Sequence, residues 1–106
     1  MTVSDADIAH AEELFAPLGA LSSRKMFGGL GIYHQDNIFA LVNRSGQIFL
    51  KAKGDFAQSL ATQGSSQFGE GHGRLMPYWT LPDTALDDPD CASDWARQAL
   101  DKLDPG

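Results

Sequence analysis

The sequence lacks the features that mark secreted and membrane-spanning chains. It has one cysteine, Cys91, so no intramolecular disulfide can form, which is usual for proteins of a reducing compartment. No apolar run approaches the ~20 residues that a membrane-spanning helix needs. The first residues include Asp5 and Asp7 and no basic residue, whereas a signal peptide begins with basic ones. We therefore expect a cytoplasmic protein with no membrane contact.

Basic residues are scarce relative to acidic ones. The chain has 8 lysines and arginines against 14 aspartates and glutamates, which gives a net charge of −6. This balance disfavours direct DNA binding, because contacts between phosphates and basic side chains supply most of the non-specific affinity. None of the expected helices is basic enough to serve as a recognition helix, so DNA contact is conceivable only through a sheet.

The charges are also distributed unevenly along the chain. Residues 24–74 carry six basic and three acidic residues, whereas residues 1–20 and 83–106 are strongly acidic. A modest basic surface flanked by acidic helices is one interpretation, and solvated charges scattered around a sheet explain the pattern equally well. The basic residues of the middle segment are Arg24, Lys25, Arg44, Lys51, Lys53 and Arg74.

Length and composition predict one globular domain, residues 1–106, because a hydrophobic fraction of 42% is enough for a single core. Between Ser4 and Leu18, apolar residues recur at three- and four-residue spacing, which predicts a helix with Ser4 as its N-cap. Near the C-terminus, Asp88 followed by Pro89 is typical of a helix start. We expect Trp95 to lie on the buried face of this last helix.

The middle of the chain has the pattern of strands arranged around one short helix. The helix is expected to begin at Asp55, and Pro77 makes the last strand an edge strand or a bulged one. The strands are expected at residues 25–33, 37–43, 47–53, 65–69 and 75–81. The predicted fold class is α+β: an antiparallel sheet of about five strands packed by N- and C-terminal helices, in the order α-β-β-β-α-β-β-α.

Apolar residues occupy both faces of the expected sheet. Leu41 alternates with Val42, and Ile48 with Phe49, so neither face is purely polar. One face is expected to meet the helices, and the other to meet more protein. A homodimer formed through this second face is one candidate.

The segment from Arg24 to Tyr33 places a basic pair before three glycines in four positions. Glycines in a strand cost backbone entropy, so this segment needs a bulge, a bend or the close approach of another group. We expect something to be packed against this backbone or bound to it. The predicted partner-binding residues are Arg24, Lys25, Phe27, Gly28, Gly29, Tyr78 and Trp79.

Tyr78 and Trp79 are the large aromatic residues most suited to a contact surface, because such rings dominate interface energetics. Packing in the core against Trp95 and Phe27 is the alternative interpretation. Adjacent strand residues face opposite sides of a sheet, so one of the two rings is expected inside and the other outside.

Residue sets for catalysis or metal binding are missing from the sequence pattern. His10, His34 and His72 fall in different expected elements, and no Cys-x-x-Cys or His-Glu-x-x-His spacing occurs. The glycine run lacks the Gly-Lys-Ser/Thr ending of a phosphate loop. The aspartates around Asp88 are explained by helix capping more simply than by a bound cation. We expect no enzyme activity, cofactor or metal.

Three sequence blocks resemble those of the TfoX/Sxy family, in its N-terminal domain. They are residues 24–32 (RKMFGGLGI), 49–51 (FLK) and 76–82 (MPYWTLP), and the resemblance covers nearly the whole chain. It implies a stand-alone N-terminal domain with helices packed against an antiparallel sheet. Full-length members of the family promote competence gene expression during DNA transformation, and the family offers no established catalytic residues.

Two functions remain open at this point. The first is a non-enzymatic regulatory module that docks on a protein partner, with the transcription machinery as the candidate partner. The second is a small-molecule binder or enzyme in which Arg24, Lys25 and Lys51 receive an anionic ligand beside the glycine-lined backbone. A closed pocket that holds two or more of these bases with a perturbed titratable group favours the second, and an open aromatic patch favours the first.

Overall fold

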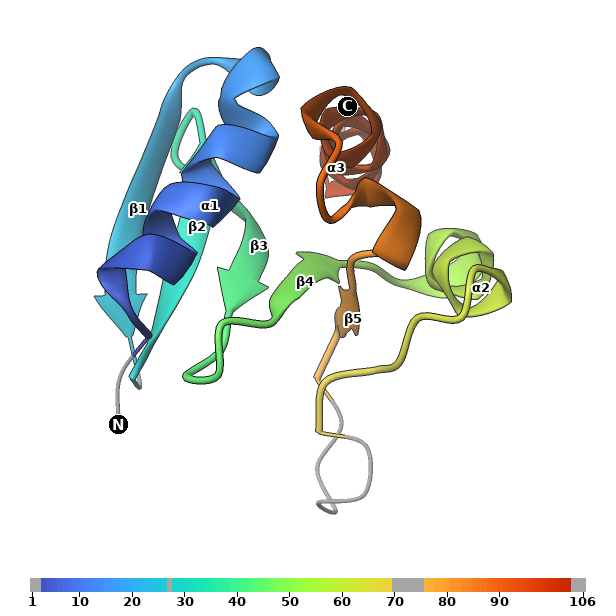
Figure 1. Ribbon diagram of the computed structural model, residues 1–106. Helices are drawn as coiled ribbons and strands as arrows, with labels where there is room; N and C mark the ends of the chain where they lie inside the picture. Colours follow the sequence, from blue (N-terminus) through green and yellow to red (C-terminus); the bar gives the residue numbers. More distant parts are fainter. Residues whose placement is uncertain (1–2, 27, 70–75, 104–106) are drawn as a thin grey trace.

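The computed structural model describes residues 3–26, 28–69 and 76–103. Five strands and three α-helices make up the described part of the chain (Figure 1). Two short 3₁₀ helices, Ala16–Leu18 and Asp83–Ala85, lie between them. The elements are α1 (Asp5–Phe15), β1 (Leu21–Met26), β2 (Gly29–His34), β3 (Asn37–Val42), β4 (Ile48–Lys51), α2 (Gly54–Thr62), β5 (Tyr78–Thr80) and α3 (Pro89–Leu103).

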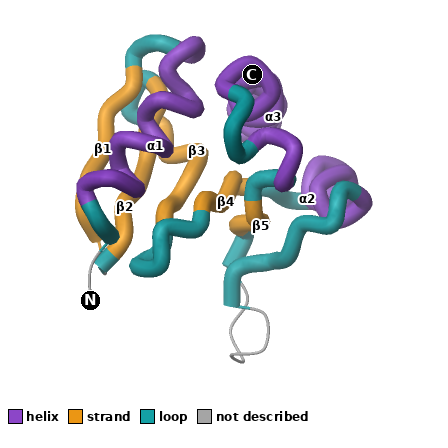
Figure 2. Tube along the Cα trace, viewed as in Figure 1, coloured by secondary structure: helices purple, strands orange, loops and turns teal. Residues whose placement is uncertain are grey.

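The five strands form one antiparallel sheet in the spatial order β1-β2-β3-β4-β5. The α+β fold class predicted from the sequence is thus confirmed. The order of elements differs in one place: four strands precede α2 and one follows it, giving α-β-β-β-β-α-β-α. All three helices lie on one side of the sheet (Figure 2). None of the described helices is long and apolar enough to cross a bilayer.

The segment expected as one strand, residues 25–33, is in fact a hairpin between β1 and β2. Met26 pairs with Gly29, and Gly28 between them has a φ of +82°, a backbone conformation that glycine adopts without steric cost. Val3 N–H donates to the Gly28 carbonyl at 2.7 Å, which ties the N-terminal segment to this turn. Phe27 lies outside the described residues.

The strand expected at residues 65–69 is wrong. Only Gln67 pairs in this segment, through an isolated bridge to Trp79. Phe68 N–H also donates to the Tyr78 carbonyl, and Thr80 N–H donates to the Ser66 carbonyl. The expected strand at 75–81 is shortened to Tyr78–Thr80, and it begins after Pro77, which cannot donate to a ladder. Residues 70–75, between these two segments, lie outside the described residues.

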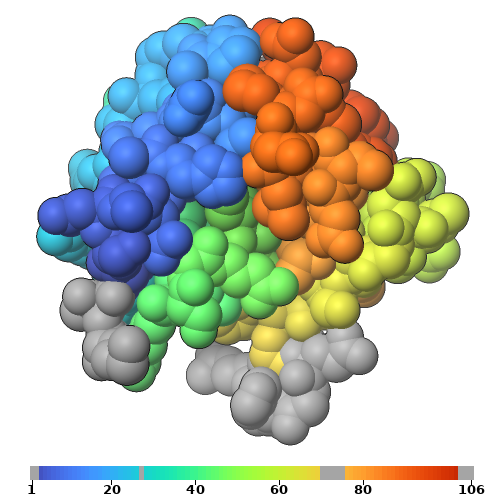
Figure 3. Space-filling model, viewed as in Figure 1, coloured from blue at the N-terminus to red at the C-terminus, as the bar shows by residue number. Residues whose placement is uncertain are grey.

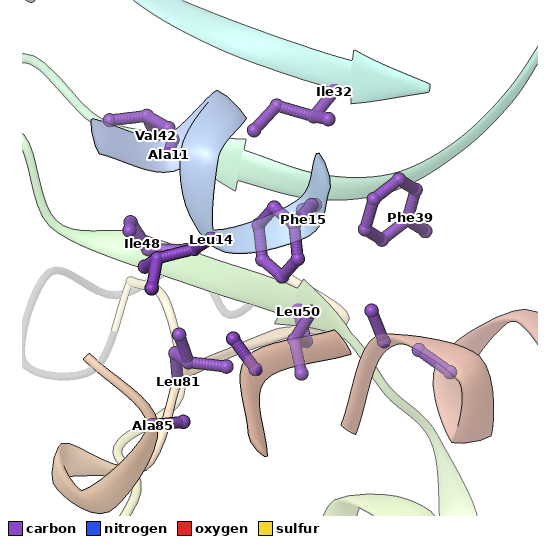
Figure 4. Close-up of a cluster of buried hydrophobic side chains, with 14 of the residues drawn as sticks. Ala11, Leu14, Phe15, Ile32, Phe39, Val42, Ile48, Leu50, Leu81 and Ala85 are labelled. Atoms are coloured by element: carbon purple, nitrogen blue, oxygen red, sulfur yellow. The ribbon is translucent and has the colours of Figure 1, made fainter. Parts of the chain in front are cut away.

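The core lies between the sheet and the helices. Leu14 and Phe15 of α1 lie over Ile32, Ile48 and Leu50 of the sheet (Figure 4). The Phe15 and Phe39 rings meet edge to face, with centroids 5.2 Å apart. Figure 3 shows α1 and the C-terminal segment meeting over this side of the molecule.

Both terminal helices begin as the sequence predicts. Ser4 caps α1, its hydroxyl accepting from Asp7 N–H at 3.1 Å. The Asp88 carboxylate accepts from Asp90 N–H at 3.1 Å and from Cys91 N–H at 3.2 Å, with Pro89 as the first residue of α3. These caps satisfy backbone donors that have no partner within the helix.

The buried face of α3 is made mainly of small residues. Ala92, Ala96 and Ala99 are fully buried, and so is Ser93, whose hydroxyl donates to the Leu14 carbonyl at 3.0 Å. Trp95, expected on the buried face, is only half-buried and packs beside Phe56 at the border of the core. Small side chains let α3 approach α1 closely, and the large ring is accommodated at the side.

Candidate functional site

The sheet has a second face that points away from all three helices, here called the open face. Successive side chains of a strand point to opposite faces of the sheet, so the residues that alternate with the core residues lie on the open face. The open face carries Arg24, Met26, Tyr33, Ile38, Leu41, Phe49, Lys51 and Tyr78. The described part of the segment that follows α2, residues 63–69, runs away from the helices (Figure 1).

A hollow of about 900 Å³ opens on this face, here called the open-face hollow. Its wall is mostly apolar, and the β3–β4 turn supplies its polar part. Its lining residues are Met26, Gly29, Leu30, Ile38, Leu41, Val42, Asn43, Arg44, Ser45, Phe68, Met76 and Tyr78. Its volume lies within the range of ~300–1,000 Å³ that is usual for ligand and anchor sites.

The β3–β4 turn that borders the hollow is held by its own side chains. Asn43 Oδ1 accepts from Ser45 N–H at 3.0 Å and from Gln47 N–H at 2.9 Å. Gly46 completes the turn with a φ of +87°, which a residue with a side chain rarely adopts. This network fixes the backbone from which Arg44 projects.

The predicted contact with the glycine-rich backbone is confirmed, and the chain's own atoms make it. A Cβ at Gly29 would collide with the Val42 carbonyl oxygen, so β2 and β3 approach closely only because the position is glycine. A Cβ at Gly31 would meet the Met26 methyl group at 2.7 Å. A Cβ at Gly28 would lie 3.1 Å from Arg44 Nε.

The predicted basic pair is divided between the two faces of the sheet. Arg24 pairs with Gly31 and lies on the open face, its guanidinium 5.6 Å from the centre of the Tyr33 ring. Lys25 pairs with Leu30, a core residue, so its side chain lies on the helix side. Both residues are exposed. The two charges therefore do not form one surface.

The structure also separates Tyr78 from Trp79. Tyr78 lines the open-face hollow and is only 7% exposed, whereas Trp79 pairs with Leu50 and packs half-buried against the core. Burial raises the pKa of the Tyr78 hydroxyl above 10.0, and the nearby Tyr33 adds to the effect. Tyr78 is therefore neutral at physiological pH.

The cations proposed for an anionic ligand do not converge. Lys25 lies on the helix side, while Arg24 on β1 and Lys51 on β4 are separated by three strand spacings, about 14 Å. Among these cations and Arg44, only Arg44 lines the hollow. The hollow is also partly open, which is more typical of docking than of enclosing a small ligand.

The described histidines have structural partners. His10 Nε2 is 2.8 Å from the Leu86 carbonyl, and His34 Nδ1 is 2.9 Å from the Gly19 carbonyl. His72 lies outside the described residues. Within residues 3–26, 28–69 and 76–103, no group of three or more histidine, cysteine or acidic side chains is arranged to hold a metal ion.

Sequence reasoning missed most of the hollow's lining, above all Met26, Ile38, Leu41, Arg44 and Phe68. A signal was present for Leu41, since alternation already placed apolar residues on both sheet faces. The contribution of Phe68 had no local signal, because its position beside the sheet depends on a hydrogen bond from its N–H to the Tyr78 carbonyl at 2.7 Å.

The fold and this surface define an α+β domain in which the helices cover one sheet face and leave the other, with its hollow, free of helices. Residues 13–103 match the TfoX N-terminal domain family, and the chain belongs to that family. A similar protein is the DNA transformation protein TfoX1 of Aliivibrio fischeri (strain ATCC 700601 / ES114), which is 28% identical over 72 residues. The match covers 64% of this chain and 34% of TfoX1, so the chain spans about a third of that relative's length.

Proposed function

We propose that this chain is a non-enzymatic, cytoplasmic regulatory domain that acts by docking a protein partner on the open face of its sheet. The observation that carries the proposal is the mostly apolar open-face hollow, which the helices leave uncovered. Exposed concave apolar surfaces of this kind are typical of interaction sites. Family membership supports a regulatory role, and the name of TfoX1 supports a role in the control of DNA transformation.

Within this proposal, the partner belongs to the transcription machinery that expresses competence genes. The predicted contact residues Arg24, Gly28, Gly29 and Tyr78 border or line the open face. Trp79 and Lys25 lie on the helix side instead. Phe27 remains a predicted contact residue that lies outside the described part of the chain.

The proposal predicts that Leu41→Glu abolishes function in the source organism. Leu41 lines the hollow, and a carboxylate there disfavours apolar contact with a partner. We expect a chromosomal Leu41→Glu replacement to lower competence-gene transcripts and transformation frequency as far as deletion of the gene does. Transcript quantification and a transformation assay measure both effects.

Ala61→Glu is the matched control, because it adds the same charge at an exposed position of α2. This variant is expected to retain wild-type transcript levels. If deletion of the gene changes neither transcripts nor transformation, the competence role is wrong. If Leu41→Glu and Ala61→Glu behave alike, the open face is not the docking surface.

A further inference from the structure

Basic side chains surround the open-face hollow. Arg44 lines it, Arg24 lies two residues along β1 from the lining residue Met26, and Lys51 is the cross-strand partner of Tyr78. All three cations belong to the open face or to the turn at its border. Within the described residues, none of these three cations forms an ion pair. The ion pair found among the described residues joins Arg97 to Asp94 on α3.

Most of the described acidic residues lie elsewhere, although the Asp7 carboxylate lies beside Gly46 of the β3–β4 turn. They belong to the three helices and to the segments that flank α3, with the exception of Asp36. Asp36 occupies the β2–β3 turn, at the opposite end of β2 from Gly29, and the lining residue nearest to it in the sequence is Ile38. Among the described residues, the open face therefore carries mainly basic and apolar side chains, and the helix layer carries mainly acidic ones.

Building on the proposed function, we propose that the open-face hollow binds an acidic amphipathic segment of the partner protein. A bulky apolar side chain of this segment enters the hollow between Met26 and Leu41. Carboxylates that flank it meet Arg24, Arg44 and Lys51. Charge complementarity of this kind steers association and selects against wrong partners.

Other occupants fit the open face less well. A second copy bound face to face would bring the three cations of each chain toward those of the other, which is electrostatically unfavourable. Single-stranded nucleic acid needs exposed aromatic rings on which bases stack. Here Phe49 is 5% exposed, Tyr78 is 7% exposed, and Tyr33 lies beneath the Arg24 guanidinium.

A peptide selection tests the proposal with the full chain. Random peptides of roughly a dozen residues, displayed on phage, are selected against the immobilised protein, and enriched sequences are synthesised for fluorescence polarisation. We expect aspartate and glutamate to be enriched around leucine, phenylalanine or tryptophan. We also expect affinity to fall as salt shortens the screening length from about 30 Å at 0.01 M to about 8 Å at 0.15 M. Enrichment of basic or uncharged peptides, or no enrichment, overturns the proposal.

Arg24→Glu and Lys25→Glu form a matched pair of variants. The residues are adjacent and exposed, the charge change is identical, and only their faces differ. We expect Arg24→Glu to weaken binding of the selected peptides roughly tenfold, and Lys25→Glu to change it by less than about twofold. Equal effects would show that net charge, and not the open face, drives binding, which overturns the proposal.

Leu41→Glu and Met26→Glu test the apolar part of the site, and either variant that retains the wild-type circular dichroism spectrum serves. Loss of peptide binding in that variant supports the proposal, whereas unchanged binding overturns it.

Two further arms test the competing occupants. Binding of a labelled oligothymidylate that Arg24→Glu abolishes, or a dimer in sedimentation velocity that Leu41→Glu dissociates, assigns the face to nucleic acid or to a second copy.

The two proposals fail in distinguishable ways. If Leu41→Glu abolishes competence-gene expression but the selected peptides are basic or uncharged, the docking function stands and the acidic partner is wrong. If acidic peptides bind the open face but deletion of the gene has no effect on transformation, the recognition chemistry stands and the competence role is wrong.

Discussion

Gly29 lies where the β2 backbone passes close to β3. A Cβ added there would collide with the Val42 carbonyl oxygen, which belongs to the backbone and has little freedom to move. A Cβ at Gly31 would instead meet the ends of the Met26, Ile38 and Tyr33 side chains, which can rotate away. Glycine at position 29 therefore avoids a collision with rigid backbone, whereas glycine at position 31 avoids contacts that flexible side chains can relieve.

We predict that Gly29→Ala destabilises the fold by ~1–3 kcal/mol, the usual cost of overpacking a close contact. Gly31→Ala is the control, with an expected cost below ~1 kcal/mol because flexible side chains relieve the contact. Urea denaturation of both variants gives the free energies of unfolding. Equal costs for the two substitutions would contradict this account of Gly29.

The Tyr78 hydroxyl has a titration that the structure changes. Burial raises the pKa of its hydroxyl in the folded state, so above pH 10 the unfolded chain loses this proton before the folded one does. The contribution of Tyr78 to stability is complete below pH 10 and is lost as pH rises through the folded-state pKa. The free energy of unfolding falls in this pH range because the folded state binds more protons than the unfolded state.

We predict that Tyr78→Phe removes part of this alkaline loss. The difference in unfolding free energy between wild type and Tyr78→Phe is expected to stay constant from neutral pH to about pH 9 and to shift in favour of the variant above about pH 10. Urea titrations across this range measure it. A difference that does not change with pH would mean that the hydroxyl is more solvated than its burial indicates.

At the scale of elements, α3 shows how a helix packs through small residues. Ala92, Ala96 and Ala99 face the core, and Ser93 satisfies its buried hydroxyl on the Leu14 carbonyl of α1. The sequence pattern indicated that Trp95 carries the buried face, because large apolar residues usually do. The structure places it at the border beside Phe56, with ring centroids 6.2 Å apart.

This placement lowers the expected effect of Trp95→Ala. A fully buried tryptophan would cost about 3–5 kcal/mol on truncation, but a half-buried one loses less apolar area, so we predict roughly 2 kcal/mol. Thermal or urea unfolding of the variant checks this value. A cost near zero, or one above about 4 kcal/mol, would mean that the ring is packed differently.

Elements with local signals could be predicted well. The caps at Ser4 and Asp88 depend on neighbouring backbone donors, so both helix starts were read from a few residues. The hairpin at Gly28 was missed because apolar character continues through it from β1 into β2. The segment at residues 65–69 had strand composition but lacks a strand-length partner, and pairing is a tertiary property.

At the scale of the whole molecule, the sheet separates two chemical environments. The helix layer carries nearly all the described acidic residues, and the open face carries Arg24, Lys51 and the border residue Arg44. The charge distribution along the chain suggested a basic surface between acidic helices. In the folded chain the basic residues are divided between the two faces of the sheet: Lys25 lies on the helix side and Arg24 on the open face.

The sequence by itself determined the fold class, the caps of the two terminal helices, the family and the presence of apolar residues on both sheet faces. These follow from local hydrogen bonding, from sequence motifs and from side-chain periodicity. The expected cap of α2 at Asp55 was wrong, because α2 begins at Gly54 after Lys53 and has no side-chain cap. Tertiary structure alone decided which face each residue occupies. A one-residue change of register reverses every side chain, so the pairing of Trp79 with core residue Leu50 is what directs Tyr78 to the hollow. The open-face hollow likewise exists only after β1, β3, the β3–β4 turn and Phe68 are brought together, and no local pattern encodes that meeting.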